Sequence, residues 1–181
     1  MMAKTKVFLG AFGIDLPLDQ LLNQALVSLS QHVREALDIA RRWQQDPLVM
    51  DKWFAIQAAT PGVGTVARVE ALMRHPAFTM RNPNKVRAVL GVFAMSNPTA
   101  FHAADGSGYR LLADRVLELD ALNPQVAARI VGAFNPWLRH EPTRRALMKA
   151  QLQRIAAAPG LSGDVSEIVE SALGMEGLEA G

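Results

Sequence analysis

The chain has 181 residues, of which 50% are hydrophobic and 6% aromatic, and it contains no Cys. Its 19 Lys and Arg residues exceed its 17 Asp and Glu residues by two, so the formal net charge is +2. This composition argues against intrinsic disorder, excludes disulfides, thiolate zinc sites and a Cys nucleophile, and does not by itself indicate a nucleic-acid partner.

The longest apolar runs predict no membrane partner. They span residues 7–14 and 89–95, far short of the ~20 residues that a membrane-spanning helix needs. Asp15 ends the first run, and no cleavage pattern typical of a signal peptide follows. With the absence of Cys, which fits a reducing compartment, these features predict a cytoplasmic protein.

Helical periodicity predicts an all-α fold. Apolar residues recur at i, i+3, i+4 and i+7, the spacing of one helix face, starting at Val33, Val86, Ala127 and Val165. The pattern predicts helices over 18–29, 32–44, 47–59, 64–74, 83–95, 109–119, 124–134, 142–157 and 163–173. No stretch shows the sustained alternation of a strand.

Asp-Pro and Asn-Pro pairs mark the starts of three of these helices. The pairs are Asp46-Pro47, Asn82-Pro83 and Asn123-Pro124. The Asp or Asn side chain can accept a hydrogen bond from a free helix N–H, and Pro has a preset φ with no donor to leave unpaired. A fourth signal, the DGSG run at 105–108, predicts a turn that caps the helix beginning at Tyr109.

One internal repeat indicates a solenoid. Residues 82–93 align with residues 123–134 at an offset of 41, with Asn, Pro, Gly and Phe identical and the apolar positions in register. Periods of ~40–47 residues are typical of HEAT and armadillo repeats, which stack into a curved surface. The sequence therefore predicts a superhelical α-solenoid of antiparallel helix pairs.

The sequence contains no convincing catalytic or metal site. His140-Glu141 begins like a zinc-protease motif, but Pro142 follows and position 144 is Arg, so the second imidazole at i+4 is missing. Ser107 has no nucleophile elbow around it. We therefore expect no catalytic residue, no metal ligand and no cofactor in this chain.

A set of basic residues from Arg41 to Arg154 leaves two interpretations of their role open. They could line a cationic groove that binds nucleic acid, or they could be solvated side chains interspersed with acidic ones. The second interpretation is favoured because stacking aromatics are scarce. The residues concerned are Arg41, Arg42, Arg68, Arg74, Arg81, Lys85, Arg87, Arg139, Arg144, Arg145, Lys149 and Arg154.

Three stretches carry a family resemblance. They are RWQQDPLVMDKWF at 42–54, HPAF at 75–78 running into RNPNKVR at 81–87, and FHAADGSGY at 101–109 followed by NPQVA at 123–127. Together they resemble the C-terminal helical domain of bacterial aminopeptidase N, a zinc metallo-aminopeptidase family, over about residues 33–173. Residues 1–32 lack the resemblance and are interpreted as a divergent or vector-encoded, partly helical segment, and 174–181 as a flexible tail.

The resemblance implies a function for the domain. In the family, this α-solenoid closes over a catalytic domain that carries the His-Glu-x-x-His zinc helix, encloses the substrate chamber and shapes peptide access and specificity. Neither that motif nor the family's Gly-Ala-Met-Glu-Asn loop occurs here. We therefore expect this chain to be inactive alone, with zinc and catalysis supplied by the parent enzyme's catalytic domain.

The resemblance also identifies substrate-channel residues. Gln125 and Arg129 match positions that lie near the peptide in the family. On a helix they fall at i and i+4, apart from the apolar face that starts at Ala127, and both side chains can hydrogen-bond a peptide. The expected partners are the catalytic domain and peptide substrate. The alternatives are a free-standing protein-interaction module, which would self-associate through exposed apolar surface, and, less favoured, a nucleic-acid-binding solenoid.

Overall fold

The computed structural model describes residues 31, 42 and 46–175. The chain divides into two compact units, Met1–Asp46 and Pro47–Gly181. In the first unit, Gln31 and Arg42 are helical. The helix predicted over 18–29, the remainder of that over 32–44, and residues 176–181 of the predicted tail lie outside the described residues.

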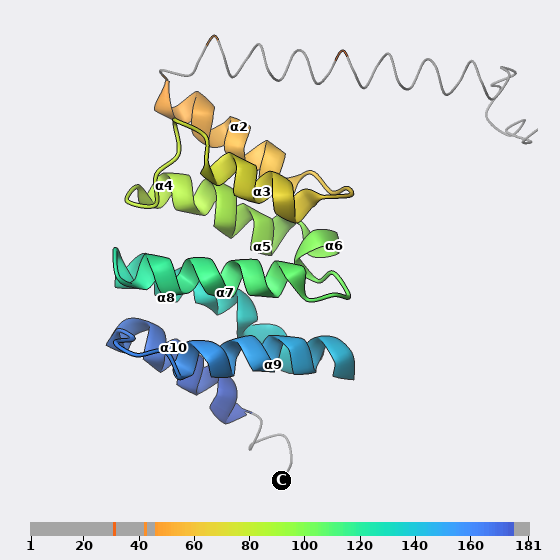
Figure 1. Ribbon diagram of the computed structural model, residues 1–181, viewed down its shortest axis with the longest axis vertical. Helices are drawn as coiled ribbons and strands as arrows, with labels where there is room; N and C mark the ends of the chain where they lie inside the picture. The colour runs from red at the N-terminus through yellow and green to blue at the C-terminus, as the bar shows by residue number, and fades with distance from the viewer. Residues whose placement is uncertain (1–30, 32–41, 43–45, 176–181) are drawn as a thin grey trace, which may run out of the picture. The chain divides into compact units, whose positions relative to one another are not determined.

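The second unit is built from helices throughout its described residues, 47–175, which contain no strand (Figure 1). In chain order they are α2 (Pro47–Ala59), α3 (Thr65–Met73), α4 (Pro83–Val86), the π-helical η2 (Arg87–Gly91), α5 (Val92–Ser96), α6 (Pro98–Phe101), α7 (Ser107–Asp120), α8 (Pro124–Val131), the 3-10 helix η3 (Gly132–Arg139), α9 (Pro142–Ala156) and α10 (Gly163–Gly174). Over these residues, the helices are too short or too polar to cross a lipid bilayer. The all-α prediction is confirmed.

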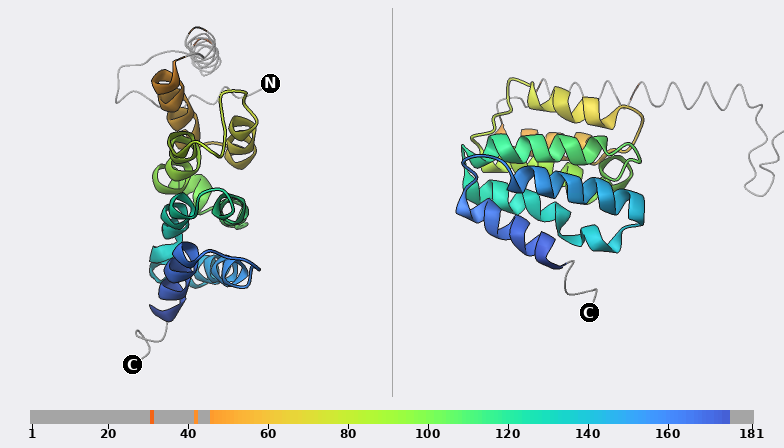
Figure 2. Two further views of the ribbon diagram at one scale, coloured as in Figure 1. Left: turned by 90° about the vertical axis from the view of Figure 1, so that its left-hand side faces the viewer. Right: turned by 60° about the horizontal axis from the view of Figure 1, so that its bottom comes forward.

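The helices of the second unit lie in two layers. One layer holds α2, the continuous α4–η2–α5 helix, α8 and α10, and the other holds α3, α7 and α9 (Figure 2, left). Consecutive helices pack across the layers, as α7 does with α8, whereas helices of neighbouring repeats stack within a layer, as α8 does with α10. Each repeat thus buries its apolar face on its neighbours. The predicted solenoid-like architecture is confirmed.

Asn-Pro pairs begin the helices as the sequence predicts. The Asn82 side chain accepts a hydrogen bond from the backbone N–H of Asn84 at 2.9 Å, and Asn123 accepts one from Val126 at 3.2 Å. Asn97 does the same for α6, a four-residue helix that the periodicity did not predict because it is shorter than two turns.

The DGSG run forms the predicted turn. The Asp105 carboxylate accepts hydrogen bonds from the backbone N–H and the hydroxyl of Ser107, at 2.9 and 2.7 Å. Gly106 has a φ of 69°, in the left-handed region that glycine tolerates. α7 begins at Ser107, two residues before the predicted start at Tyr109.

The two copies of the internal repeat depart from a regular α-helix in different ways. In the first, Val92 N–H bonds to Arg87 C=O, five residues back, which makes a π-helical turn that ends at Gly91. In the second, the α-helix ends at Val131, not at the predicted residue 134, and continues as a 3-10 helix. Pro136 explains this difference because it lacks an N–H and its ring clashes with the preceding turn.

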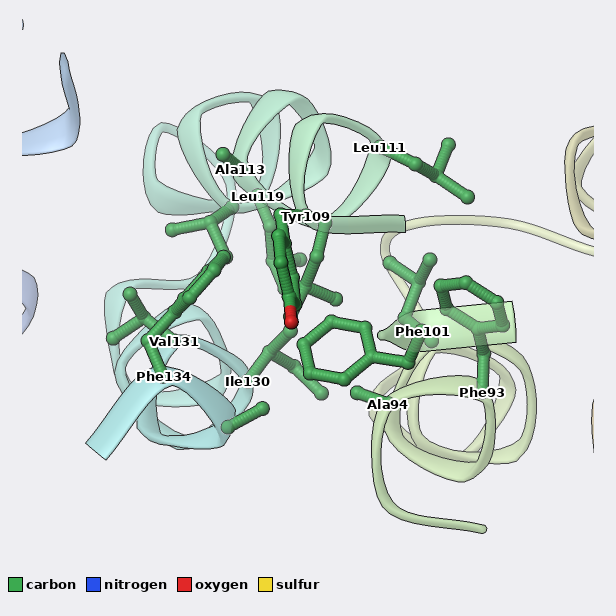
Figure 3. Close-up of a cluster of buried hydrophobic side chains, with 14 of the residues drawn as sticks. Phe93, Ala94, Phe101, Tyr109, Leu111, Ala113, Leu119, Ile130, Val131 and Phe134 are labelled. Carbon is green, nitrogen blue, oxygen red and sulfur yellow. The ribbon is translucent and has the colours of Figure 1, made fainter. Parts of the chain in front are cut away.

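A buried aromatic cluster holds α5, α6, α7 and η3 together (Figure 3). The Phe101 ring centroid lies 5.9 Å from that of Phe93, 5.2 Å from that of Tyr109 and 6.1 Å from that of Phe134. These four side chains are essentially inaccessible to solvent. Edge-to-face contacts between such rings are favourable beyond the area they bury, so the cluster fixes α5 and η3 relative to each other.

Candidate functional site

A groove of about 330 Å³ lies between two helices of one layer, α4–η2–α5 and α8–η3. We call it the α5–α8 groove. Its lining residues are Arg87, Gly91, Val92, Ala94, Met95 and Ser96 from the first helix, and Arg129, Ile130 and Ala133 from the second. The lining is mostly apolar and includes two arginines and no acidic residue. The groove therefore combines positive charge with apolar surface.

The two arginines differ in how they are held. The Arg87 guanidinium donates from Nη2 to Asn84 Oδ1 at 2.7 Å and from Nε to Pro83 C=O at 3.2 Å. Arg129 is exposed and forms no hydrogen bond or ion pair with the residues that the structure describes. Its donors are therefore available, and a guanidinium presents them in the fixed fork that matches a carboxylate or two carbonyl oxygens.

The local backbone brings the apolar part of the groove into place. The π-helical turn adds one residue, so the side chains beyond it are rotated by about 100° relative to an uninterrupted α-helix. The groove is then lined by adjacent pairs, Gly91 with Val92 and Met95 with Ser96. Met95 is 75% exposed. A flexible thioether at this position can adapt to different apolar side chains.

The structure separates the two residues predicted to line a substrate channel. Arg129 lines the α5–α8 groove, whereas Gln125, one turn earlier on α8, is exposed but outside its lining. The sequence did not pair Arg129 with Arg87 or Met95. Arg87 was recognised only as one of several basic residues, and the repeat places Ala88, not Arg87, at the position equivalent to Arg129.

A second hollow of about 370 Å³ lies in the other layer, between α3 with its following loop and α7. It is lined by Glu70, Met73, Arg74, Phe78, Thr79, Met80, Arg115 and Glu118. Its charges are balanced, and Arg115 already pairs with Glu118 at 2.9 Å. The α5–α8 groove is the better candidate for anion binding because its arginines face no such acid.

The described part of the chain has no cluster of three or more His, Asp or Glu side chains that could hold a metal ion. Its histidines have other contacts. His75 Nδ1 accepts a hydrogen bond from Ala77 N–H, and His102 Nδ1 lies 2.8 Å from the Tyr109 hydroxyl. The groove therefore offers binding groups, and its one hydroxyl, that of Ser96, has no histidine or carboxylate beside it in the lining.

The fold and the groove define a class: an armadillo-like α-solenoid with a basic, apolar groove between two helices of one layer. The family that matches is described as "Domain of unknown function (DUF3458_C) ARM repeats" and covers residues 20–174. The chain belongs to this family. It resembles the C-terminal helical domain of bacterial aminopeptidase N, as the three sequence stretches predicted.

Similar proteins carry the name aminopeptidase. The chain is 48% identical over 132 residues to aminopeptidase N of Caulobacter vibrioides, and 41% identical over 160 residues to that of Escherichia coli. These matches cover 73% and 84% of this chain but only 15% and 18% of the relatives. A solved structure of Legionella pneumophila aminopeptidase A in complex with aspartic acid matches with a TM-score of 0.76 and 35% identity, over 82% of this chain and 17% of that one.

Proposed function

We propose that this chain is the noncatalytic C-terminal domain of a zinc-dependent aminopeptidase, where it encloses the substrate chamber and shapes peptide access and specificity. Membership of the aminopeptidase-associated family supports the first part. The observation that carries the second is Arg129, which lines the α5–α8 groove with its guanidinium unpaired among the described residues. The partners are the enzyme's catalytic domain and a peptide, and we place the enzyme in the cytoplasm.

The groove acts by binding the part of the peptide beyond the bond that is cut. Arg129 and Arg87 attract the peptide's carboxylate or carbonyl oxygens. Val92, Met95 and Ile130 provide apolar contacts for a neighbouring side chain. Gln125, on the same helix, hydrogen-bonds the peptide outside the groove. The domain thereby selects peptides without taking part in bond cleavage.

The described residues do not fit a zinc site, because they lack a cluster of metal-binding side chains. The proposal therefore assigns zinc and the hydrolytic step to the catalytic domain. In the parent enzyme, this chain's contribution is limited to binding and orienting the peptide and to closing the chamber against solvent.

The experiment is the Arg129→Ala substitution in the intact aminopeptidase, assayed with several tripeptides. A hydrogen bond to a charged group contributes about 1.5 kcal/mol at the lower end of its range, which corresponds to roughly a tenfold change in affinity. We expect KM to rise about tenfold with little change in kcat or in zinc content, because uniform binding is lost.

Arg139→Ala is the matched control. Arg139 is also an exposed arginine, at the end of η3, but it does not line the groove. We expect its kinetic constants to equal those of the unmodified enzyme. Unchanged constants for Arg129→Ala across all the peptides would remove the proposed role of the groove.

A further inference from the structure

Two histidines lie in contact where the turn after α6 meets the start of α9. The His102 and His140 ring centroids are 4.4 Å apart, with 38° between the ring planes. His102 is the residue that ends α6, and its Nδ1 lies 2.8 Å from the Tyr109 hydroxyl of α7. His140 lies between η3 and α9. The pair therefore bridges segments 38 residues apart in the sequence.

Arg144 joins the same two segments from α9. Its Nε donates to the His102 C=O at 2.7 Å, and its Nη1 donates to Glu141 Oε1 at 3.0 Å. Glu141 in turn caps α9 by accepting hydrogen bonds from the backbone N–H groups of Thr143 and Arg144. The Glu141 carboxylate thus pairs with the same guanidinium that bonds the backbone of His102.

We propose that His102 and His140 form a pH-sensitive latch that holds the α6–α7 turn against the start of α9 at neutral pH and releases it on acidification. When the His102 ring is neutral, the charges beside it are those of Arg144 and Glu141, and these two balance. When this ring is protonated, its charge and that of Arg144 face one carboxylate. Repulsion at such short range in a half-buried site then favours separation.

The other ionisable groups of the packed elements do not supply this change of charge. Burial raises the pKa of the Tyr109 hydroxyl, which stays neutral. Desolvation opposes ionisation of Glu141, but hydrogen bonds from Arg144 and Thr143 outweigh it and lower its pKa, so it stays charged. Hydrogen bonds from Ser107 likewise lower the pKa of Asp105. The remaining groups are Arg110, Arg139, Arg144 and Arg145, and arginines do not lose their proton.

The direction of the effect follows from His102. Burial first, and then the charges of His140 and Arg144, lower its pKa below the ordinary 6.5. Above pH 6.5 the ring is neutral whether the latch is closed or open. As the pH falls below 6.5, the open form takes up a proton that the closed form still excludes, so the closed form loses stability. One such proton changes the opening equilibrium by at most about tenfold per pH unit.

Amide hydrogen exchange of the full 181-residue chain at pH 7.5 and 5.5 tests the latch. Each rate is divided by the intrinsic rate at the same pH to give a protection factor. We expect protection in 100–109 and 140–145 to fall about tenfold at pH 5.5, while protection in α2 and α3 changes little. An equal loss in α2 and α3 would overturn the proposal, because the effect would then be global.

The variant His140→Gln removes the ring that packs on His102 and one of the causes that lower the His102 pKa, so the loss of protection on acidification should become smaller than in the unmodified chain. His75→Gln is the matched control, because His75 is the other histidine of the second unit and its described contacts lie away from the latch. It should keep the full pH dependence. An unchanged pH dependence in His140→Gln would overturn the latch.

A measurement on the unmodified chain keeps the proposal testable if His140→Gln does not fold. The imidazole nitrogens of His102 can be followed by NMR from pH 8 to pH 5. The latch requires this ring to gain its proton below pH 6.5, and protonation at or above pH 6.5 contradicts it.

Discussion

Gly108 lies where the first turn of α7 crosses the backbone of α6, and its replacement by Ala is the most severe small change that the fold offers. A Cβ atom at this position would lie 2.4 Å from the C=O oxygen of Phe101, 2.7 Å from that of Ala100 and 2.8 Å from the Phe101 Cα. All three are backbone atoms, so no side-chain rotation relieves the contact and the two helices must move apart.

The size of the effect follows from two opposing terms. Ala is favoured over Gly within a helix by about 1 kcal/mol. Overpacking a close contact costs about 3 kcal/mol at the upper end of its usual range, and the upper end applies because backbone must shift. We therefore expect Gly108→Ala to lower the free energy of unfolding by about 2 kcal/mol and Tm by roughly 4–8 °C.

Urea unfolding followed by far-ultraviolet circular dichroism measures this change directly. Gly163→Ala is the matched control, because Gly163 is also in the first turn of a helix and a Cβ there would meet nothing within 4 Å. We expect that variant to be as stable as the unmodified chain or slightly more stable. The packing argument is refuted if Gly108→Ala unfolds at the same urea concentration as Gly163→Ala.

Two further substitutions test buried polar contacts by the same urea assay. Lys85→Met removes the buried ammonium that lies 2.7 Å from an Asp51 carboxylate oxygen, with side-chain exposures of 7% and 21%. We expect the free energy of unfolding to fall by about 2 kcal/mol, which is less than for a fully buried pair. The control Lys52→Met, at an exposed position, should change it by almost nothing. Trp137→Phe removes the indole donor that bonds the Ala172 C=O at 2.9 Å in the last turn of α10. The unpaired carbonyl and the lost volume should lower the free energy of unfolding by about 2–4 kcal/mol. For either variant, a decrease of less than about 0.5 kcal/mol would contradict the contribution of its contact to stability.

The helices could be predicted from the sequence because their signals are local. The pair Asn82-Pro83 starts a helix through one side-chain hydrogen bond and one preset φ, whatever the rest of the chain does. The pair Asn97-Pro98 carries the same signal. It was missed because the helix that follows has four residues, too few for periodicity to register.

The groove could be predicted only in part because it depends on contacts between repeats. The resemblance identified Arg129, but the sequence gives no reason to place Arg87 opposite it, since the two are 42 residues apart and the repeat offset is 41. The π-helical turn at Gly91 and the 3-10 helix after Val131 also alter which side chains line the groove. Such departures arise from packing between helices, which local periodicity does not encode.

The same limit applies to the histidine pair. His102 and His140 are far apart in sequence and match no metal-ligand spacing. Their contact arises because α6 packs on α7 and the η3–α9 junction comes beside both, as the hydrogen bond from Arg144 to the His102 C=O shows. Only the tertiary arrangement brings these rings together.

The comparison that tests the central claim most directly uses one tripeptide in two forms, with a free and with an amidated C-terminus. The intact enzyme and its Arg129→Ala variant are assayed on both, and the ratio of kcat/KM for the free acid to that for the amide is measured. If the α5–α8 groove binds the peptide carboxylate, the ratio falls about tenfold in the variant. The same ratio in both enzymes would contradict the account.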